Sequence, residues 1–238
     1  MRLLAVVPHL DDEAISCGGL IQVRVEQGWD VGVLCVYGRM ADYENATDMA
    51  EEEQDFLAAK KLLGFQRHWF HHQQEGEPSQ VGYYKVLEVI EKALSYFEPQ
   101  EVVGPSPEDL NQDHRFLAHV RGIALRPVNL RTVRKHLEFI ALDGTVQSPT
   151  FFVPLTQAHV DTKLASVAAY RKEARGGTSP RAPENMIAQM RVWGSRCGHA
   201  YAEGYRLRFA RETDEDCNYR QLGVHRHEPD AVSGENRA

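Results

Sequence analysis

The residues best suited to chemistry follow the first apolar segment of the chain. Residues 3–7 are an apolar run that stops at Pro8, and His9, Asp11 and Asp12 follow almost at once. A short continuous apolar run is typical of a strand buried on both faces, and open α/β sheets build their sites where such strands end. The imidazole and one carboxylate can bind a metal ion, and the second carboxylate is then free to act as a base.

A second polar cluster of this kind occurs later in the chain. Residues 105–115 read Pro-Ser-Pro-Glu-Asp-Leu-Asn-Gln-Asp-His-Arg and also follow an apolar segment. If the two strands are neighbours in a parallel sheet, both clusters emerge at the same edge. His9, Asp12 and His114 would then form a ligand set that suits a catalytic zinc ion with one position open to water. Zinc lowers the pKa of such a water to about 7, and Asp11 would accept its proton.

Simpler roles explain the same residues one at a time. A lone Asp11 or Asp12 is well suited to cap the helix that follows, and Asn111 or Asp113 could cap the next one. His114 by itself could be a surface side chain. Beside a metal, Asp113 would instead orient a neighbouring ligand. The spacing alone therefore leaves the metal site and the helix caps open as alternatives.

The elements that must position these residues alternate between strand and helix patterns. In the first half we expect strands at 2–7, 31–36, 67–71 and 102–103, and helices at 13–27, 48–63, 83–97 and 113–125. This alternation predicts a parallel sheet with right-handed crossovers. Further on we expect strands at 136–142 and 150–155 and helices at 158–175 and 184–201. The prediction is a single α/β domain over residues 1–210, with a mostly parallel sheet flanked by helices, and a polar, partly disordered tail over 211–238.

Composition narrows the class of protein. The net charge of −7 argues against a general nucleic-acid binder. The sequence has no apolar run near the roughly 20 residues that a membrane span requires, and its start lacks the pattern of a signal peptide. Its 4 cysteines are scattered, which favours reduced thiols and a cytoplasmic location.

Three motifs occur in order along the chain. Residues 8–13 read Pro-His-Leu-Asp-Asp-Glu, with Gly18 and Gly19 after them, and residues 106–115 read Ser-Pro-Glu-Asp-Leu-Asn-Gln-Asp-His-Arg. Residues 198–205 read Gly-His-Ala-Tyr-Ala-Glu-Gly-Tyr. Together these segments resemble the signature segments of the LmbE-like (PIG-L type) zinc-dependent N-deacetylases, and the resemblance runs through the whole predicted domain.

The resemblance implies a Rossmann-like α/β fold and the hydrolysis of an acetamide on an amino sugar, such as an N-acetylglucosamine conjugate. It also implies that His9, Asp12 and His114 bind Zn²⁺, with Asp11 as the general base. Two imidazoles and a carboxylate suit Fe²⁺ or Co²⁺ as well. A homo-oligomer would be consistent with the family.

Residue 111 departs from the family pattern. The family often has a His three residues before its motif His, and this chain has Asn111 there. An Asn amide can donate a hydrogen bond to an oxyanion but does not titrate, so a proton relay through Asp113 would be altered. Elsewhere, Arg39 matches a region where family members contact substrate, although a solvated loop arginine is an equal explanation.

Two other functions remain open. One is an amidase that acts on a non-sugar N-acyl amine. The other is a carbohydrate-binding relative that has lost its chemistry, for which Asn111 is the supporting feature.

Overall fold

The computed structural model describes residues 1–38, 46–74, 80–126, 132–139, 148–171 and 177–212. Within them, a seven-stranded sheet has the order β3-β2-β1-β4-β5-β7-β6. In chain order the elements are β1 (Arg2–Val7), α1 (Asp12–Glu26), β2 (Asp30–Gly38), α2 (Ala46–Leu63), β3 (Arg67–Gln74), α3 (Gln80–Phe97), β4 (Glu101–Pro105), α4 (Gln112–Ala124), β5 (Lys135–Phe139), β6 (Phe151–Leu155), α5 (Gln157–Ala168), α6 (Pro183–Cys197) and β7 (Tyr201–Ala210).

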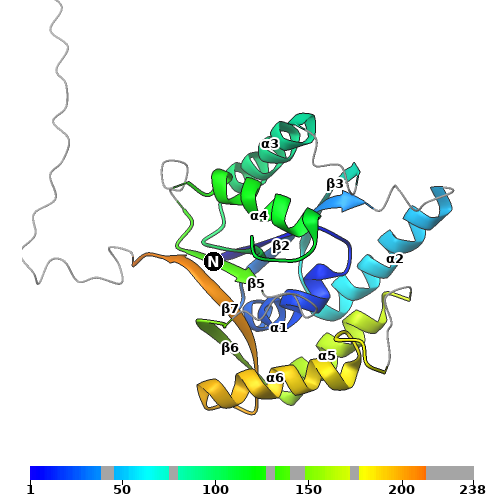
Figure 1. Cartoon of the computed structure of the whole chain (residues 1–238), viewed down its shortest axis with the longest axis vertical. Helices are drawn as coiled ribbons and strands as arrows, with labels where there is room; N and C mark the ends of the chain where they lie inside the picture. The colour runs from blue at the N-terminus through cyan, green and yellow to red at the C-terminus, as the bar shows by residue number, and fades with distance from the viewer. Residues whose placement is uncertain (39–45, 75–79, 127–131, 140–147, 172–176, 213–238) are drawn as a thin grey trace, which may run out of the picture.

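The sheet is parallel from β3 to β5, and β7 runs antiparallel to both of its neighbours. Helices α1, α2, α5 and α6 pack on one face of the sheet, and α3 and α4 pack on the other (Figure 1). Residues 3–7 of β1 are fully buried because both faces of this central strand are covered. The predicted single-domain α/β fold with a mostly parallel sheet is therefore confirmed.

The sequence prediction was wrong near the end of the domain. The helix expected at 158–175 ends at Ala168, and the helix expected at 184–201 ends at Cys197. Gly198 ends that second helix in the left-handed conformation, with φ 79°. Strand β7 was missed, although apolar Tyr205, Leu207 and Phe209 alternate with basic residues as a half-exposed strand does. Residues 140–142 of the expected strand 136–142, and the predicted tail from 213 onward, lie outside the described residues.

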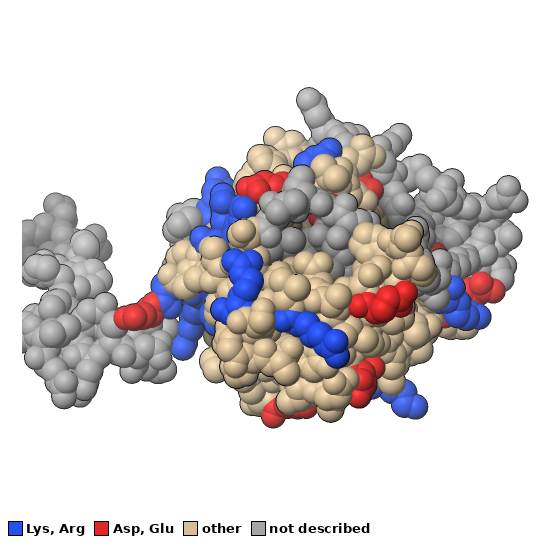
Figure 2. Space-filling model, turned by 60° about the horizontal axis from the view of Figure 1, so that its bottom comes forward, with Lys and Arg blue, Asp and Glu red and all other residues tan. Residues whose placement is uncertain are grey.

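Three observations bear on the expectations from composition. No helix in the described ranges is long and apolar enough to cross a membrane. Cys17, Cys35 and Cys197 are free, and the first two are buried. Acidic and basic side chains both occur on the face in Figure 2, and much of that face is uncharged.

Candidate metal centre

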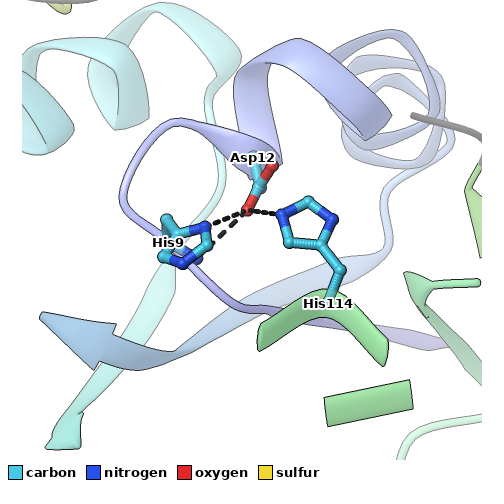
Figure 3. A group of neighbouring side chains, drawn as sticks. All are labelled: His9, Asp12 and His114. Carbon is cyan, nitrogen blue, oxygen red and sulfur yellow. Dashed lines mark hydrogen bonds and ion pairs between the residues drawn. The ribbon is translucent and has the colours of Figure 1, made fainter. Parts of the chain in front are cut away.

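The two polar clusters meet because their strands are parallel neighbours. Strands β1 and β4 pair in register, with Leu3 beside Glu101, so both carboxyl ends open at one edge of the sheet. His9 lies in the loop after β1, Asp12 is the first residue of α1, and His114 comes from the first turn of α4 (Figure 3). One potential ligand atom from each of these three residues lies within 4.8 Å of the other two.

The carboxylate of Asp12 lies between the two imidazoles. Its Oδ2 atom is 3.3 Å from His9 Nδ1 and 3.4 Å from His114 Nε2. The same oxygen accepts the backbone N–H of His9 at 3.1 Å. Burial would raise the pKa of Asp12, but His114 and His9 outweigh it and hold that pKa well below its usual range. A charged carboxylate is thus fixed at the middle of the group.

A further carboxylate contacts the other ring nitrogen of each imidazole. Asp109 Oδ2 lies 2.9 Å from His114 Nδ1, and Asp113 Oδ2 lies 3.5 Å from His9 Nε2. Histidine ligands of metals commonly have such a carboxylate behind them. The sequence suggested Asp113 for this role but missed Asp109, which was visible as the Asp of the Ser-Pro-x-Asp motif.

These carboxylates decide the charge of the imidazoles. Burial lowers the pKa of His9, but Asp113 and Asp12 outweigh burial and raise it to about 9. Burial likewise lowers the pKa of His114, but Asp12 and Asp109 raise it to about 10. At neutral pH and without a bound cation, both nitrogens of each ring are therefore protonated and the ring is positively charged. Metal binding at such ligands releases protons.

Asp11 stands beside this group with a strained backbone. Its φ is 150°, a conformation that residues with a side chain rarely adopt outside functional sites. The side chain makes no capping hydrogen bond to α1, so the helix-cap alternative does not hold for it. Asp11 Oδ2 lies 3.2 Å from Arg181 Nη1, and only 2% of the residue is exposed.

Buried Glu13 holds the Asp11 backbone. Its Oε2 atom accepts the Asp11 N–H at 3.2 Å, and its Oε1 atom accepts the hydroxyl of Tyr170. Burial raises the pKa of Glu13 to about 8, against the effect of the Tyr170 hydrogen bond. Sequence reasoning assigned no role to either residue. Glu13 was nevertheless part of the first motif, whereas Tyr170 lay in a segment expected to be helical.

The loop before α6 is built to place Arg181. Ser179 Oγ accepts the Arg181 backbone N–H at 3.2 Å, and Asn185 Nδ2 donates to the Ser179 carbonyl at 2.8 Å. The Arg181 side chain is 20% exposed, so it is open on one side. No sequence pattern indicated this contact, because Arg181 is distant in the chain and carries no motif.

Asn111 caps helix α4. Its Oδ1 atom accepts the backbone N–H of Asp113 at 2.8 Å and that of His114 at 3.4 Å. The capping alternative for Asn111 is therefore correct, and the cap fixes the turn that carries His114. An amide donates through Nδ2, so the predicted oxyanion contact remains compatible with this cap and stays a prediction. The predicted substrate contact, Arg39, lies outside the described residues.

The third motif supports the helix that carries Asp12. Helix α1 is interrupted at Cys17, where φ is −141°. Glu203 of β7 caps the second half of the helix, accepting the Gly19 N–H at 2.8 Å and the Leu20 N–H at 2.7 Å. A Cβ at Gly19 would lie 2.7 Å from Glu203 Cδ, so glycine is required there. Buried Lys163 pairs with Glu203 at 2.5 Å.

The fold and the site define an α/β protein with a candidate metal centre at the carboxyl edge of its sheet. The family model described as PIG-L, GlcNAc-PI de-N-acetylase, matches residues 4–124. This match spans half of the chain and includes every residue of the His9, Asp12 and His114 group. The chain belongs to the PIG-L family.

Solved structures share the fold. The conserved protein TT1542 from Thermus thermophilus has a TM-score of 0.73 and 25% identity, over 89% of this chain and 96% of that one. N,N'-diacetylchitobiose deacetylase from Pyrococcus horikoshii has a TM-score of 0.69 and 17% identity, over 87% of this chain and 83% of that one. GalB, the 4-carboxy-2-hydroxymuconate hydratase of Pseudomonas putida, has a TM-score of 0.69 and 20% identity, over 89% of this chain and 98% of that one.

Proposed function

We propose that this protein is a metal-dependent hydrolase that removes an N-acetyl group from an amino sugar or its conjugate. The observation that carries the proposal is the His9, Asp12 and His114 group, with the buried Asp11 directly before Asp12 in the chain. Two comparisons support the substrate class: the family model is described as a GlcNAc-PI de-N-acetylase, and one protein of the same fold is a deacetylase of diacetylchitobiose.

The three residues fit a divalent cation. Two imidazoles and one carboxylate, with further carboxylates behind both rings, are a donor set suited to Zn²⁺ and also to Fe²⁺ or Co²⁺. We propose His9, Asp12 and His114 as the ligands. When bound, such an ion polarises an amide carbonyl and makes water acidic enough to react at neutral pH.

Asp11 is the proposed general base. In the reaction, the oxygen of water adds to the acetyl carbonyl carbon while the Asp11 carboxylate takes the proton. Asp11 then gives that proton to the amide nitrogen as the C–N bond breaks, which leaves acetate and a free amine. The Glu13 contact to the Asp11 backbone and the Arg181 contact to its side chain both hold the carboxylate in place.

The remaining roles concern the oxyanion and the substrate. We propose that the Nδ2 group of Asn111 donates to the oxyanion, while its Oδ1 atom caps α4. Asp113 orients His9 and does not relay a proton to residue 111, because an amide does not titrate. Arg39 stays a candidate for binding a substrate hydroxyl, phosphate or carboxylate.

A matched pair of variants tests the proposal. Asp11→Asn is expected to keep the metal and lose most acetate release, whereas Asp12→Asn is expected to lose both. Asp161→Asn, at an exposed position on α5, serves as the control and should change neither. Metal content and acetate release are measured on the same preparations. Full activity in Asp11→Asn would remove Asp11 from the mechanism.

Two further functions are kept as alternatives. A fold alone does not fix a reaction, and GalB is a hydratase with this fold. If the protein holds metal but releases acetate only from non-sugar N-acyl amines, the amidase alternative is correct. If it binds sugars with no turnover, it is a binding relative.

A further inference from the structure

A second cavity, separate from the metal centre, lies along the later part of α4. Its volume is about 410 Å³, which is in the range of small-molecule sites. Strands β5 and β7 form its floor, on the face of the sheet that carries α3 and α4. None of the residues that line it belongs to the metal centre. They are Pro107, Ala118, His119, Gly122, Ile123, Leu125, His136, Glu138, Arg208 and Phe209.

The floor presents two buried polar side chains with unused atoms. His136 and Glu138 point to the α4 side of β5, because Leu137 between them belongs to the core on the opposite face. His136 is 5% exposed and Glu138 is 3% exposed. Among the described residues, neither His136 Nε2 nor Glu138 Oε2 has a hydrogen-bond partner. Buried polar atoms are nearly always paired, so these two atoms indicate a partner other than the described residues.

Cationic donors lie next to this acceptor. Glu138 lies beside Gly104 of the neighbouring strand β4. The guanidinium of Arg121 occupies the space next to this glycine, because a Cβ added to Gly104 would lie 1.7 Å from Arg121 Nη1. Arg121 Nη2 donates to the Pro105 carbonyl, but Nε and Nη1 have no partner within the described part of the chain. Arg208 Nε lies 3.9 Å from Glu138 Oε1. The floor therefore presents the Glu138 carboxylate and the Arg208 guanidinium, and the fully buried Arg121 adds a second positive charge behind them.

The opposite wall is apolar and open. Ala118, Ile123 and Leu125 of α4 and its C-terminal end supply hydrocarbon surface. At Gly122 a Cβ would have no neighbour within 4 Å among the described residues, so none of them fills the space above the helix at this point. A ligand can thus lie with one side against hydrocarbon and the other toward the polar floor.

We propose that this cavity binds a neutral, polyhydroxylated molecule of about the size of a monosaccharide. A hydroxyl both donates and accepts, so it can satisfy a carboxylate, an imidazole and a guanidinium at the same time. A hydrocarbon would leave the buried polar atoms unpaired. An amine would meet the Arg208 guanidinium, and a small anion would meet the Glu138 carboxylate. Burial lowers the pKa of His136 to about 2, so its ring is neutral and offers one donor and one acceptor.

The test is a ligand-observed NMR titration of the full chain with D-glucose, D-galactose and D-mannose. None of these sugars carries an acetamide, so the measurement does not depend on the reaction at the metal centre. Gly122→Trp fills the cavity from an exposed helix position, and Glu138→Leu removes the acceptor without adding bulk. Val192→Trp, at a 58% exposed position on α6, is the control for adding a tryptophan.

We expect at least one sugar to bind, with affinity at least about tenfold weaker in both cavity variants and unchanged in Val192→Trp. Asp11→Asn should bind the sugar as the wild type does. Two results would overturn the proposal. One is that no sugar binds, which would mean that water alone meets the polar floor. The other is binding that neither cavity variant weakens, which would place the sugar elsewhere.

Discussion

Glu203 lies 2.8 Å from the backbone N–H of Gly19, and this contact joins the last motif of the chain to the first. The carboxylate caps a helix that restarts after a break, and that helix begins with Asp12. Lys163 neutralises the carboxylate inside the protein, where both side chains are almost fully buried. The late motif thus acts on the candidate metal centre through the backbone of α1 and not by direct contact.

The Glu203–Lys163 ion pair predicts how single and double variants at these two positions differ in stability. Glu203→Gln and Lys163→Met should each destabilise the fold by about 3–5 kcal/mol, because each leaves a buried charge without its partner. The double variant should lose less than the sum of the two single losses. Denaturant unfolding measures all three. Additive losses would show that the two side chains act independently.

Asp109 is predicted to tune the affinity for metal. Asp109→Asn weakens the contact that orients the His114 ring at 2.9 Å, so metal affinity should fall about 10- to 100-fold. Competition with a chelator measures this change. Glu108→Gln is the matched control, since Glu108 is exposed and pairs with Arg206 instead. Equal affinities in wild type and Asp109→Asn would mean that the cap on α4 is enough to position His114.

Arg181 is predicted to position the base. Arg181→Met leaves the Asp11 carboxylate without its 3.2 Å contact, and a small displacement of a reacting group can cost about 10²-fold in turnover. We expect kcat to fall on this scale with metal content unchanged, and Arg181→Lys to restore part of the loss. Arg196→Met, at an exposed position on α6, should leave kcat unchanged. If Arg181→Met changed only KM, Arg181 would be a substrate contact.

His136 is predicted to make the fold sensitive to acid. Burial and then Arg121 lower its pKa in the folded state to about 2, compared with an ordinary 6.5. Below pH 6.5 the unfolded chain binds a proton at His136 and the folded chain does not. The free energy of unfolding therefore decreases as the pH is lowered from neutral. At pH 5 the loss is about 2 kcal/mol. When unfolding is measured at pH 7 and pH 5, His136→Leu should lose about 2 kcal/mol less stability between the two pH values than the wild type does. The same loss in both proteins would contradict the role of His136.

The sequence predicted those features that depend on local pattern. The apolar run before Pro8 identified β1. Because a polar cluster follows each of two strands, the sequence also predicted that His9 and His114 lie at the same edge of the sheet. Contacts between distant segments had no such pattern. Arg181, for example, holds Asp11 through a contact between residues 170 positions apart, which only the folded chain creates. Strand β7 was missed because the preceding helix was expected to continue to residue 201, past the left-handed Gly198 that ends it.

The central claim is that acetate release depends on the ion held by His9, Asp12 and His114. The most direct measurement is acetate release from N-acetylglucosamine as free sugar, nucleotide sugar and glycosides, with metal-stripped and zinc-restored protein. We predict release from at least one of these substrates, its loss on stripping and its return with zinc. Release that survives stripping would contradict the role of the metal. Absence of release from every substrate, with metal bound, would contradict the proposed sugar deacetylase.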